Sequence, residues 1–327
     1  MKIADIELPG IPLILAPMED VTELPFRIIC KRYGADLMFT EFVASEGLIR
    51  DVAKSVDKLR IDERERPVGI QIFGHDVDSL VIAAERALEA NPDIIDLNCG
   101  CPVKKVVNKG AGAAMMKTPE KIEEAVKRIV QISNKPVTVK TRLGWDAGSV
   151  NIEEIAFRVQ DAGAAALTIH GRTRAQMYTG EANWNIIANI KANPNIRIPI
   201  IGNGDIISGE SAKQKLDQSN VDGLMIGRAA VGNPWIFNQI KHYLKTGTEL
   251  PLPNMQERID VCKEHIEMSL DYKGEKRTVF EMRHHYVKYF KGVENFKPYK
   301  MRLMQTTNVE EVFEVLDELR EFGNLAI

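Results

Sequence analysis

Cys101 is the residue of this 327-residue chain whose surroundings point most directly to chemistry. It lies between Gly100 and Pro102, so a rigid turn follows the apolar run Ile94–Asn98, which predicts a strand. A thiol with an ordinary pKa of about 8.5 is mostly protonated at neutral pH, and a protonated thiol can serve as a general acid. A nucleophilic cysteine would need a paired histidine and an oxyanion hole, and the sequence assigns neither. We therefore predict that Cys101 donates a proton.

The neighbouring Cys99 raises the alternatives of a metal site or a disulfide. A structural zinc site takes four ligands, and the sequence has no second pair of cysteines or histidines at a suitable spacing. A disulfide between Cys99 and Cys101 would be strained. We expect no metal, and we expect Cys30, Cys99 and Cys262 to be buried thiols in a reducing, cytoplasmic compartment.

A second group of candidate residues combines cations with glycines at the ends of apolar runs. Lys140 lies within such a run, and a lysine is rarely buried without a partner. Gly204 and Gly227 end two later runs, and Arg228 follows at once. Glycines there let backbone N–H groups approach a phosphate, and an arginine can pair with it. Asn203–Asp205 alone is a common turn, but together these residues predict a phosphate site, with Lys140 beside a ring that gains negative charge, as a reduced flavin does.

Between Leu13 and Gly227 short β-rich apolar runs alternate with longer segments of helical spacing, such as Asp78–Ala90 and Pro119–Ile132. Several runs are almost entirely apolar, as expected for parallel strands buried on both faces. Eight such units predict an α/β fold, a TIM-type (β/α)8 barrel, in which the carboxyl ends of the strands line the active site. A doubly wound sheet is the alternative, but the sequence lacks an early Gly-x-Gly-x-x-Gly motif. The predicted strands are Leu13–Met18, Leu37–Ala44, Val68–Gly74, Ile94–Asn98, Val137–Arg142, Ala166–His170, Pro199–Gly202 and Gly223–Gly227.

The character of the chain changes after Ile240. Thr246, Gly247, Pro251 and Pro253 indicate a linker, and no strand-like run follows it. We predict a barrel domain over residues 1–243 and a small C-terminal all-helical bundle over residues 244–327. Its expected helices are Gln256–Tyr272, Thr278–Phe290, roughly Lys300–Met304, and Val309–Phe322.

Composition and charge limit the class of protein. With 44% hydrophobic and 27% charged residues the chain is globular. The apolar run Ile11–Met18 is much shorter than the roughly 18 residues of a membrane span, and no cleavage site precedes the acidic pair after it, so we expect no membrane segment and no signal peptide. The net charge of −3 argues against nucleic-acid binding. However, Lys273–Arg302 holds nine basic against three acidic residues, and the segment from Leu303 to the end holds six acidic and one basic. Such neighbours are often two solvated helix faces, and an RNA surface is the alternative.

The string Asn98–Val106 resembles the signature of the tRNA-dihydrouridine synthases, in particular their bacterial B-type branch. Further strings agree with it, in order, from the first predicted strand into the helical part. They are Leu15–Met18 with Pro25–Arg27, Gln71–Gly74, Val139–Arg142, Thr168–Arg172, Gly202–Asp205 and Gly227–Ala230.

The resemblance implies an FMN-containing barrel that reduces the C5–C6 double bond of tRNA uridines with electrons from NADPH. Cys101 would then protonate C5 while reduced flavin delivers hydride to C6, and Asn98 would contact the uracil. The flavin contacts that carry over are Ala16, Pro17 and Met18 as lining, Gln71, Lys140 and His170 near the ring, and Asn203, Gly204, Asp205, Gly227 and Arg228 at the ribityl phosphate.

The helical part resembles the RNA-binding domain of this family, so the basic stretch becomes a predicted tRNA surface. The B-type resemblance points to D-loop uridines, and we expect a monomer. Tyr286, Tyr289 and Phe290 recur at helical spacing and are expected in the core of the bundle. The predicted tRNA contacts are Lys104, Lys105 and Lys109 beside Cys101, and Arg283, Lys288, Lys291, Lys297, Lys300 and Arg302.

Two other functions stay open from the sequence. An FMN barrel acting on a free pyrimidine, like the dihydroorotate dehydrogenases, would share the barrel and the flavin but would have no need of a basic bundle. A non-catalytic RNA-binding barrel would bind tRNA without flavin chemistry.

Overall fold

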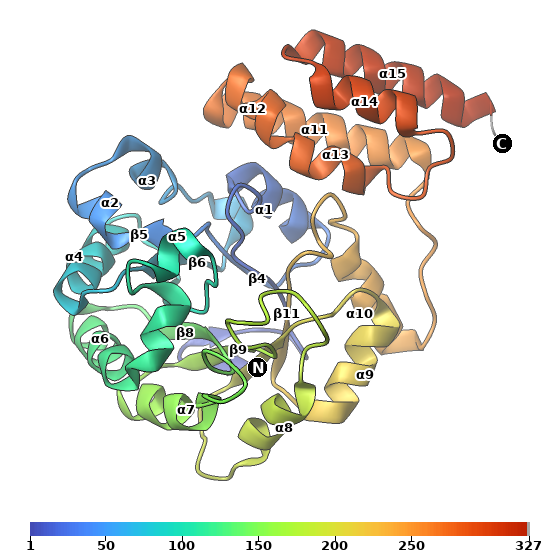
Figure 1. The fold of residues 1–327 in the computed structure, drawn as a ribbon. Coiled ribbons are helices and arrows are strands. Elements are labelled where there is room, and N and C mark those ends of the chain that lie inside the picture. The colour runs from blue at the N-terminus through green and yellow to red at the C-terminus, as the bar shows by residue number, and fades with distance from the viewer. Residues whose placement is uncertain (326–327) are drawn as a thin grey trace.

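Parallel strands form a closed barrel in the computed structural model, which describes residues 1–325 (Figure 1). Closure comes from two pairings, β11 with β3 and β4 with β6. The predicted (β/α)8 barrel is therefore confirmed, and every predicted strand coincides with an observed one to within a few residues. The barrel strands are β3 (Leu13–Leu15), β4 (Leu37–Phe39), β5 (Val43–Ala44), β6 (Val68–Phe73), β7 (Ile94–Cys99), β8 (Val137–Arg142), β9 (Ala166–His170), β10 (Ile200–Asn203) and β11 (Gly223–Ile226).

The second barrel position is occupied by two short strands, where the sequence predicted one strand over Leu37–Ala44. Both β4 and β5 pair with β6, but the chain leaves the ladder between them. The carboxylate of Glu41 accepts a hydrogen bond from the backbone N–H of Asp20 at 2.7 Å and lies 3.5 Å from the ammonium of Lys58. This contact with another loop draws the chain out of the regular strand.

The longer helices around the barrel bury an apolar face against the strands. In α6 the side chains of Ile122, Ala125, Val126 and Ile129 are fully buried, and Pro119 occupies the first turn, where its missing N–H costs nothing. The barrel helices are α1 (Leu24–Arg32), α2 (Ser45–Ile49), α3 (Ala53–Asp57), α4 (Val77–Leu88), α5 (Lys104–Val107), α6 (Pro119–Ile132), α7 (Ile152–Asp161), α8 (Trp184–Ala192), α9 (Gly209–Ser219) and α10 (Ile236–Thr246), with 3-10 turns η1 (Glu63–Glu65) and η2 (Gly112–Lys117).

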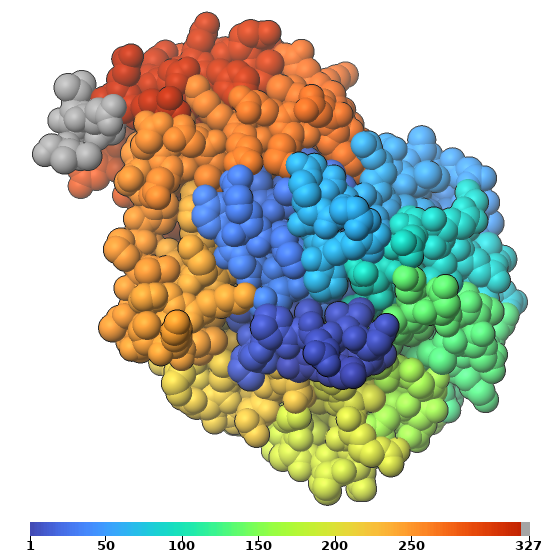
Figure 2. All heavy atoms as spheres, turned by 180° about the vertical axis from the view of Figure 1, so that it is seen from behind, coloured from blue at the N-terminus to red at the C-terminus, as the bar shows by residue number. Residues whose placement is uncertain are grey.

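A short antiparallel hairpin, β1 (Lys2–Ile3) with β2 (Ile6–Glu7), covers the amino end of the barrel. Ile3 and Leu8 are buried against residues at the starts of the strands, such as Leu37 and Ile94. Figure 2 shows this hairpin as the dark blue patch on the face seen from behind.

The C-terminal helices pack into a bundle with its own apolar core, beside the barrel (Figure 1). Tyr286, Tyr289 and Phe290 are each about 1% exposed, so the prediction that they lie in this core is confirmed. The predicted helix Thr278–Phe290 is two helices that meet at Met282. The segment between α10 and the bundle begins at Gly247, so the predicted boundary after residue 243 falls inside α10. The bundle comprises α11 (Met255–Lys273), α12 (Glu275–Glu281), α13 (Arg283–Tyr289), α14 (Lys297–Gln305) and α15 (Val309–Leu325).

Among the described residues, no helix combines the length and apolar character needed to cross a membrane.

Candidate active site

A cavity of about 1250 Å³ opens at the carboxyl ends of the barrel strands and continues toward the bundle. This is the end of a (β/α)8 barrel where catalytic residues lie. The cavity brings together every residue that the sequence placed at the acid, the uracil or the flavin: Ala16, Pro17, Met18, Gln71, Asn98, Cys101, Lys140, His170, Asn203, Gly204, Asp205, Gly227 and Arg228.

Cys101 occupies a turn that is held by the side chain of Asn98. The Oδ1 atom of Asn98 accepts hydrogen bonds from the backbone N–H groups of Gly100 at 3.0 Å and of Cys101 at 2.9 Å. Gly112 packs against the same turn: its φ is +58°, and a Cβ there would lie 2.9 Å from the carbonyl oxygen of Cys101. Burial raises the pKa of the Cys101 thiol, so the thiol keeps its proton at neutral pH.

Asn98 is in turn fixed by a chain of polar groups inside the barrel. Its Nδ2 donates to Oε1 of Gln71 at 2.9 Å, and Nε2 of Gln71 donates to Asp96 at 2.6 Å. The hydroxyl of Thr138 donates to the other carboxylate oxygen of Asp96 at 2.5 Å. Burial raises the pKa of Asp96 to about 6, against the lowering effect of these two hydrogen bonds. The Cys101 turn thus rests on a network that spans β6, β7 and β8.

Two cations lie next to this turn on β8. Nζ of Lys140 is 3.3 Å from Oδ1 of Asn203, and burial, reinforced by the charge of Arg142, lowers the pKa of Lys140 to about 8. Arg142 donates from Nε to the carbonyl of Gly100 at 2.9 Å and from Nη1 to the carbonyls of Thr173 and Met177. Burial lowers its pKa to about 10. Arg142 therefore remains cationic at neutral pH while it braces the cysteine turn.

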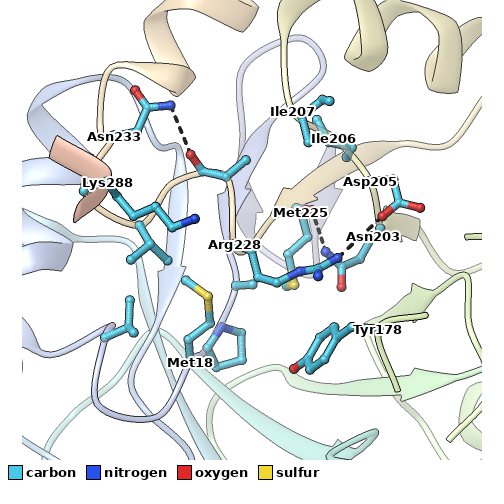
Figure 3. A pocket seen from close by; sticks show the side chains of 18 of the residues that line it. Met18, Tyr178, Asn203, Asp205, Ile206, Ile207, Met225, Arg228, Asn233 and Lys288 are labelled. Carbon is cyan, nitrogen blue, oxygen red and sulfur yellow. Dashed lines mark hydrogen bonds and ion pairs between the residues drawn. The ribbon is translucent and has the colours of Figure 1, made fainter. Parts of the chain in front are cut away.

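The far wall of the cavity carries Arg228, Asp205 and Tyr178 (Figure 3). The guanidinium of Arg228 lies over the Tyr178 ring, 4.6 Å from its centroid, and 3.6 Å from Asp205. The Asp205 carboxylate also accepts from Nη2 of Arg172 at 2.8 Å and from the backbone N–H of Ala182 at 2.7 Å. Because the Asp205 side chain is held by these protein groups, we expect the backbone of Asp205, and not its side chain, to contact a phosphate.

Glycine is required at the end of β10. Gly204 has a φ of +126°, and a Cβ at this position would lie 2.7 Å from Cβ of Ala182 and 3.1 Å from Cδ2 of His170. His170 is buried, and desolvation, followed by the charges of Arg142 and Lys140, holds its pKa well below the usual value. His170 is therefore a neutral group in a cationic cavity.

These residues fit an FMN group by the chemistry of their side chains. Lys140, Arg142 and Arg228 supply positive charge, His170 and Gln71 supply neutral polar groups, and Pro17 and Met18 supply apolar lining. A phosphate-bearing aromatic ring system that becomes anionic on reduction matches such a donor set.

The predicted tRNA contacts fall into two groups. Lys104, Lys105, Lys109, Lys297 and Lys300 are exposed, and Lys288 and Lys291 are exposed and also line the cavity. Figure 3 shows Lys288 extending from the bundle toward the cavity. By contrast, Arg302 forms a two-fold ion pair with Glu318, and Arg283 donates to the carbonyl of Thr306 while lying over the Phe280 ring. The structure thus directs these two arginines to partners within the bundle.

Three functional candidates were missed by sequence reasoning: Arg142, Arg172 and Tyr178. Both arginines stand at strand ends beside residues that were chosen, so a signal for them was present in the sequence. Tyr178 lies in the long segment after β9, and only the fold brings its ring between Arg142 and Arg228, 5.6 and 4.6 Å from the two guanidinium groups.

Comparison with known proteins identifies one family by sequence and several proteins that share the fold. The model described as "Dihydrouridine synthase (Dus)" matches residues 14–324. A protein named tRNA-dihydrouridine synthase B from Pseudomonas aeruginosa is 42% identical over 310 residues, covering 94% of this chain and 92% of that protein. A probable tRNA-dihydrouridine synthase 1 from Synechocystis is 39% identical and covers 96% and 88%. Among solved structures, morphinone reductase in complex with tetrahydroNAD shares the fold, with a TM-score of 0.51 at 12% identity, covering 78% of this chain and 91% of that one.

Proposed function

This chain belongs to the dihydrouridine synthase family, and from that membership we propose that it reduces D-loop uridine in tRNA to dihydrouridine. The proposed cofactor is FMN, and the proposed reductant is NADPH. FMN, when bound, supplies hydride chemistry; the protein supplies binding, orientation and a proton.

In this proposal Cys101 gives its proton from Sγ to C5 of the uracil. The support is the position of the thiol at the cavity wall and the raised pKa, which keeps the proton on sulfur until it is transferred. Asn98 positions the turn, and the second hydrogen of its Nδ2 group is available to the uracil. Lys140 and Arg142 hold positive charge close to the place where the flavin ring is expected.

The single observation that carries the proposal is the convergence of all thirteen predicted acid, uracil and flavin residues on one cavity. The participation of Lys288 and Lys291 in the same cavity favours a polyanionic substrate over a free pyrimidine, because phosphate contacts dominate the affinity for RNA. We propose that Lys104, Lys105, Lys109, Lys288, Lys291, Lys297 and Lys300 contact tRNA phosphates, and we propose a catalytic barrel with an RNA-binding bundle.

The test is to incubate the purified protein and NADPH with tRNA that lacks dihydrouridine but is otherwise modified, and to quantify dihydrouridine by nucleoside mass spectrometry. Dihydrouridine in the D-loop is the expected product. NADPH oxidation without dihydrouridine would overturn the proposal and favour a free pyrimidine as the substrate. Protein without bound flavin and without turnover would favour the non-catalytic RNA binder.

A further inference from the structure

The bundle touches the barrel at α1, at residues 57–60 and at the loops that follow β3 and β11. These two strands are neighbours in the barrel, since Leu13–Leu15 pairs with Leu224–Ile226. The same loops carry the cavity residues Met18 and Arg228. Figure 2 shows the blue α1 region, which follows the β3 loop, directly against the orange helices of the bundle. The attachment of the bundle is therefore part of the architecture of the active site.

A buried charge cluster fastens the β3 loop to the bundle. Lys273, at the end of α11, has a fully buried side chain, and its Nζ donates to both carboxylate oxygens of Glu23 at 2.5 Å. The same ammonium donates to Glu281 of α12 at 2.6 Å. Glu23 is the residue directly before α1 and is 4% exposed. One ammonium thus joins a barrel carboxylate to a bundle carboxylate.

Aromatic rings exclude water from this cluster. Phe26 of α1 stacks on His265 of α11 with centroids 5.4 Å apart, and it lies 4.8 Å from the ring of His285 in α13. Nε2 of His265 is 3.9 Å from Glu23. Because the charges are desolvated, the loss of one partner leaves another charge buried without compensation.

A rigid turn connects Glu23 to the cavity. The backbone N–H of Met18 donates to the hydroxyl of Thr22 at 2.9 Å, and the N–H of Thr22 donates to the carbonyl of Met18 at 3.0 Å. The guanidinium of Arg27 holds the carbonyl of Thr22 at 2.9 Å, and it is itself paired with the buried Glu65. A displacement of Glu23 is therefore passed to Met18.

A second attachment is a close approach between the backbones of the barrel and the bundle. Gly232, in the loop after β11, has a φ of +55°, and a Cβ there would lie 2.6 Å from the carbonyl oxygen of His285 and 2.8 Å from the backbone nitrogen of Tyr289. The β11 loop and α13 are therefore in direct contact.

We propose that Lys273 is a positioning residue that sets the bundle, through Glu23 and Glu281, at the place where RNA bound to it presents its uridine to Cys101. This inference rests on the proposed function. Misplacement of a reacting group by about 1 Å can cost about 100-fold in rate. Loss of Lys273 should therefore lower the rate of turnover with tRNA and leave the reduction of the flavin unchanged.

The test compares Lys273→Met with a matched variant, Lys191→Met. Lys191 also pairs with both oxygens of one carboxylate, Asp222, at 2.7 and 2.8 Å, but this pair lies within the barrel. Three quantities are measured: flavin reduction by NADPH without tRNA, the affinity for tRNA, and kcat for dihydrouridine formation. For Lys273→Met we expect kcat to fall about 10- to 100-fold, with the other two quantities within about 3-fold of wild type. Lys191→Met is expected to leave all three unchanged.

Equal losses in all three quantities, or an unchanged kcat, would overturn the inference, because a role in stability alone would not separate them. If Lys273→Met does not accumulate as folded protein, Glu23→Gln tests the same point while Lys273 keeps Glu281, and a selective fall in kcat is again expected. A pair of glycine variants tests the second attachment: Gly232→Ala is expected to lower kcat, and Gly10→Ala, at a similar φ of +49° with open space around its Cβ, is not.

Amide hydrogen exchange tests this inference independently of the proposed function. If the wild type makes no dihydrouridine, the proposed function fails. Faster exchange in residues 18–23 and in α12 of Lys273→Met would still show that Lys273 holds the loop, and unchanged exchange there would overturn that role as well.

Discussion

At the residue scale, the turn that carries the proposed acid Cys101 is held by an amide side chain three positions before it. The sequence could predict that Cys101 and Asn98 lie together, because both stand at the end of one strand. It could not predict that Oδ1 of Asn98 would accept from the backbone of the Cys101 turn, since this depends on the exact path of the turn and on Gln71 and Asp96 from neighbouring strands.

Asn98→Ala is expected to lower dihydrouridine formation about 100-fold, because the turn loses the two hydrogen bonds that it donates to Asn98 and the thiol moves. Flavin content should stay near that of wild type. Single-turnover assays with prereduced enzyme measure the effect, and Asn185→Ala, at an exposed position on α8, is the control. A rate within a few-fold of wild type would show that the turn holds its shape without Asn98.

The pH dependence of the same step tests the role of Cys101. An acid must carry its proton, and burial raises the pKa of this thiol, so the rate should stay level from neutral pH to about 8.5, the ordinary value for a thiol, and decline only above it. Cys101→Ala should lose about 100- to 10,000-fold from neutral pH to about 8.5, and less above it, while NADPH still reduces the flavin. A wild-type rate that rises with pH between 7 and 9 would instead indicate a thiolate.

At the scale of elements, the sequence pattern predicted the bounds of β8, β9 and α6 as observed, because local hydrophobic periodicity determines them. It missed the interruptions between β4 and β5 and at Met282. The first arises from the contact of Glu41 with Asp20, which is far away in the chain. At the second, the N–H of His285 bonds to the carbonyl of Met282, three residues back, where α13 meets the barrel. The first interruption comes from a tertiary contact and the second from a tightened turn, and hydrophobic periodicity contains neither.

The histidines of α11 and α13 make the stability of the bundle depend on pH. Burial lowers the pKa of His285 to about 3 and that of His265 well below its usual value. Below about pH 6.5 the unfolded chain binds protons that the folded chain excludes, so the free energy of unfolding falls with decreasing pH, by up to about 1.4 kcal/mol per pH unit for each group. In urea melts between pH 6 and 4, His285→Phe should show a shallower decline than wild type. His284→Phe, at the exposed neighbouring position, should keep the wild-type slope; equal slopes in all three proteins would contradict the assignment.

At the scale of the whole molecule, the positive charge that we propose for RNA binding is divided between barrel and bundle. Lys104, Lys105 and Lys109 come from the barrel, and Lys288 and Lys291 come from the bundle. The sequence alone predicted the basic stretch, but only the structure shows which of its members lack partners among the described residues and which, like Arg302, are paired.

Lys288→Ala should weaken tRNA binding, because one phosphate contact is lost. The slope of the logarithm of the binding constant against the logarithm of the salt concentration should become shallower by about one. Arg302→Ala should change neither quantity appreciably, since its guanidinium already serves Glu318. Filter binding across a series of salt concentrations measures the affinity and its salt slope for both variants and for the wild type. A larger effect for Arg302 than for Lys288 would mean that the Arg302–Glu318 pair opens when RNA binds.

The helix α15 carries six acidic residues over Glu310–Glu321 and lies on the side of the bundle away from the barrel (Figure 1). We expect this acidic helix to repel the phosphates of an approaching RNA and the exposed lysines at the cavity to attract them. Although the net charge is −3, the proposed substrate would then approach more often in the orientation that faces the cavity, and added salt should weaken this long-range bias before it weakens the contacts themselves.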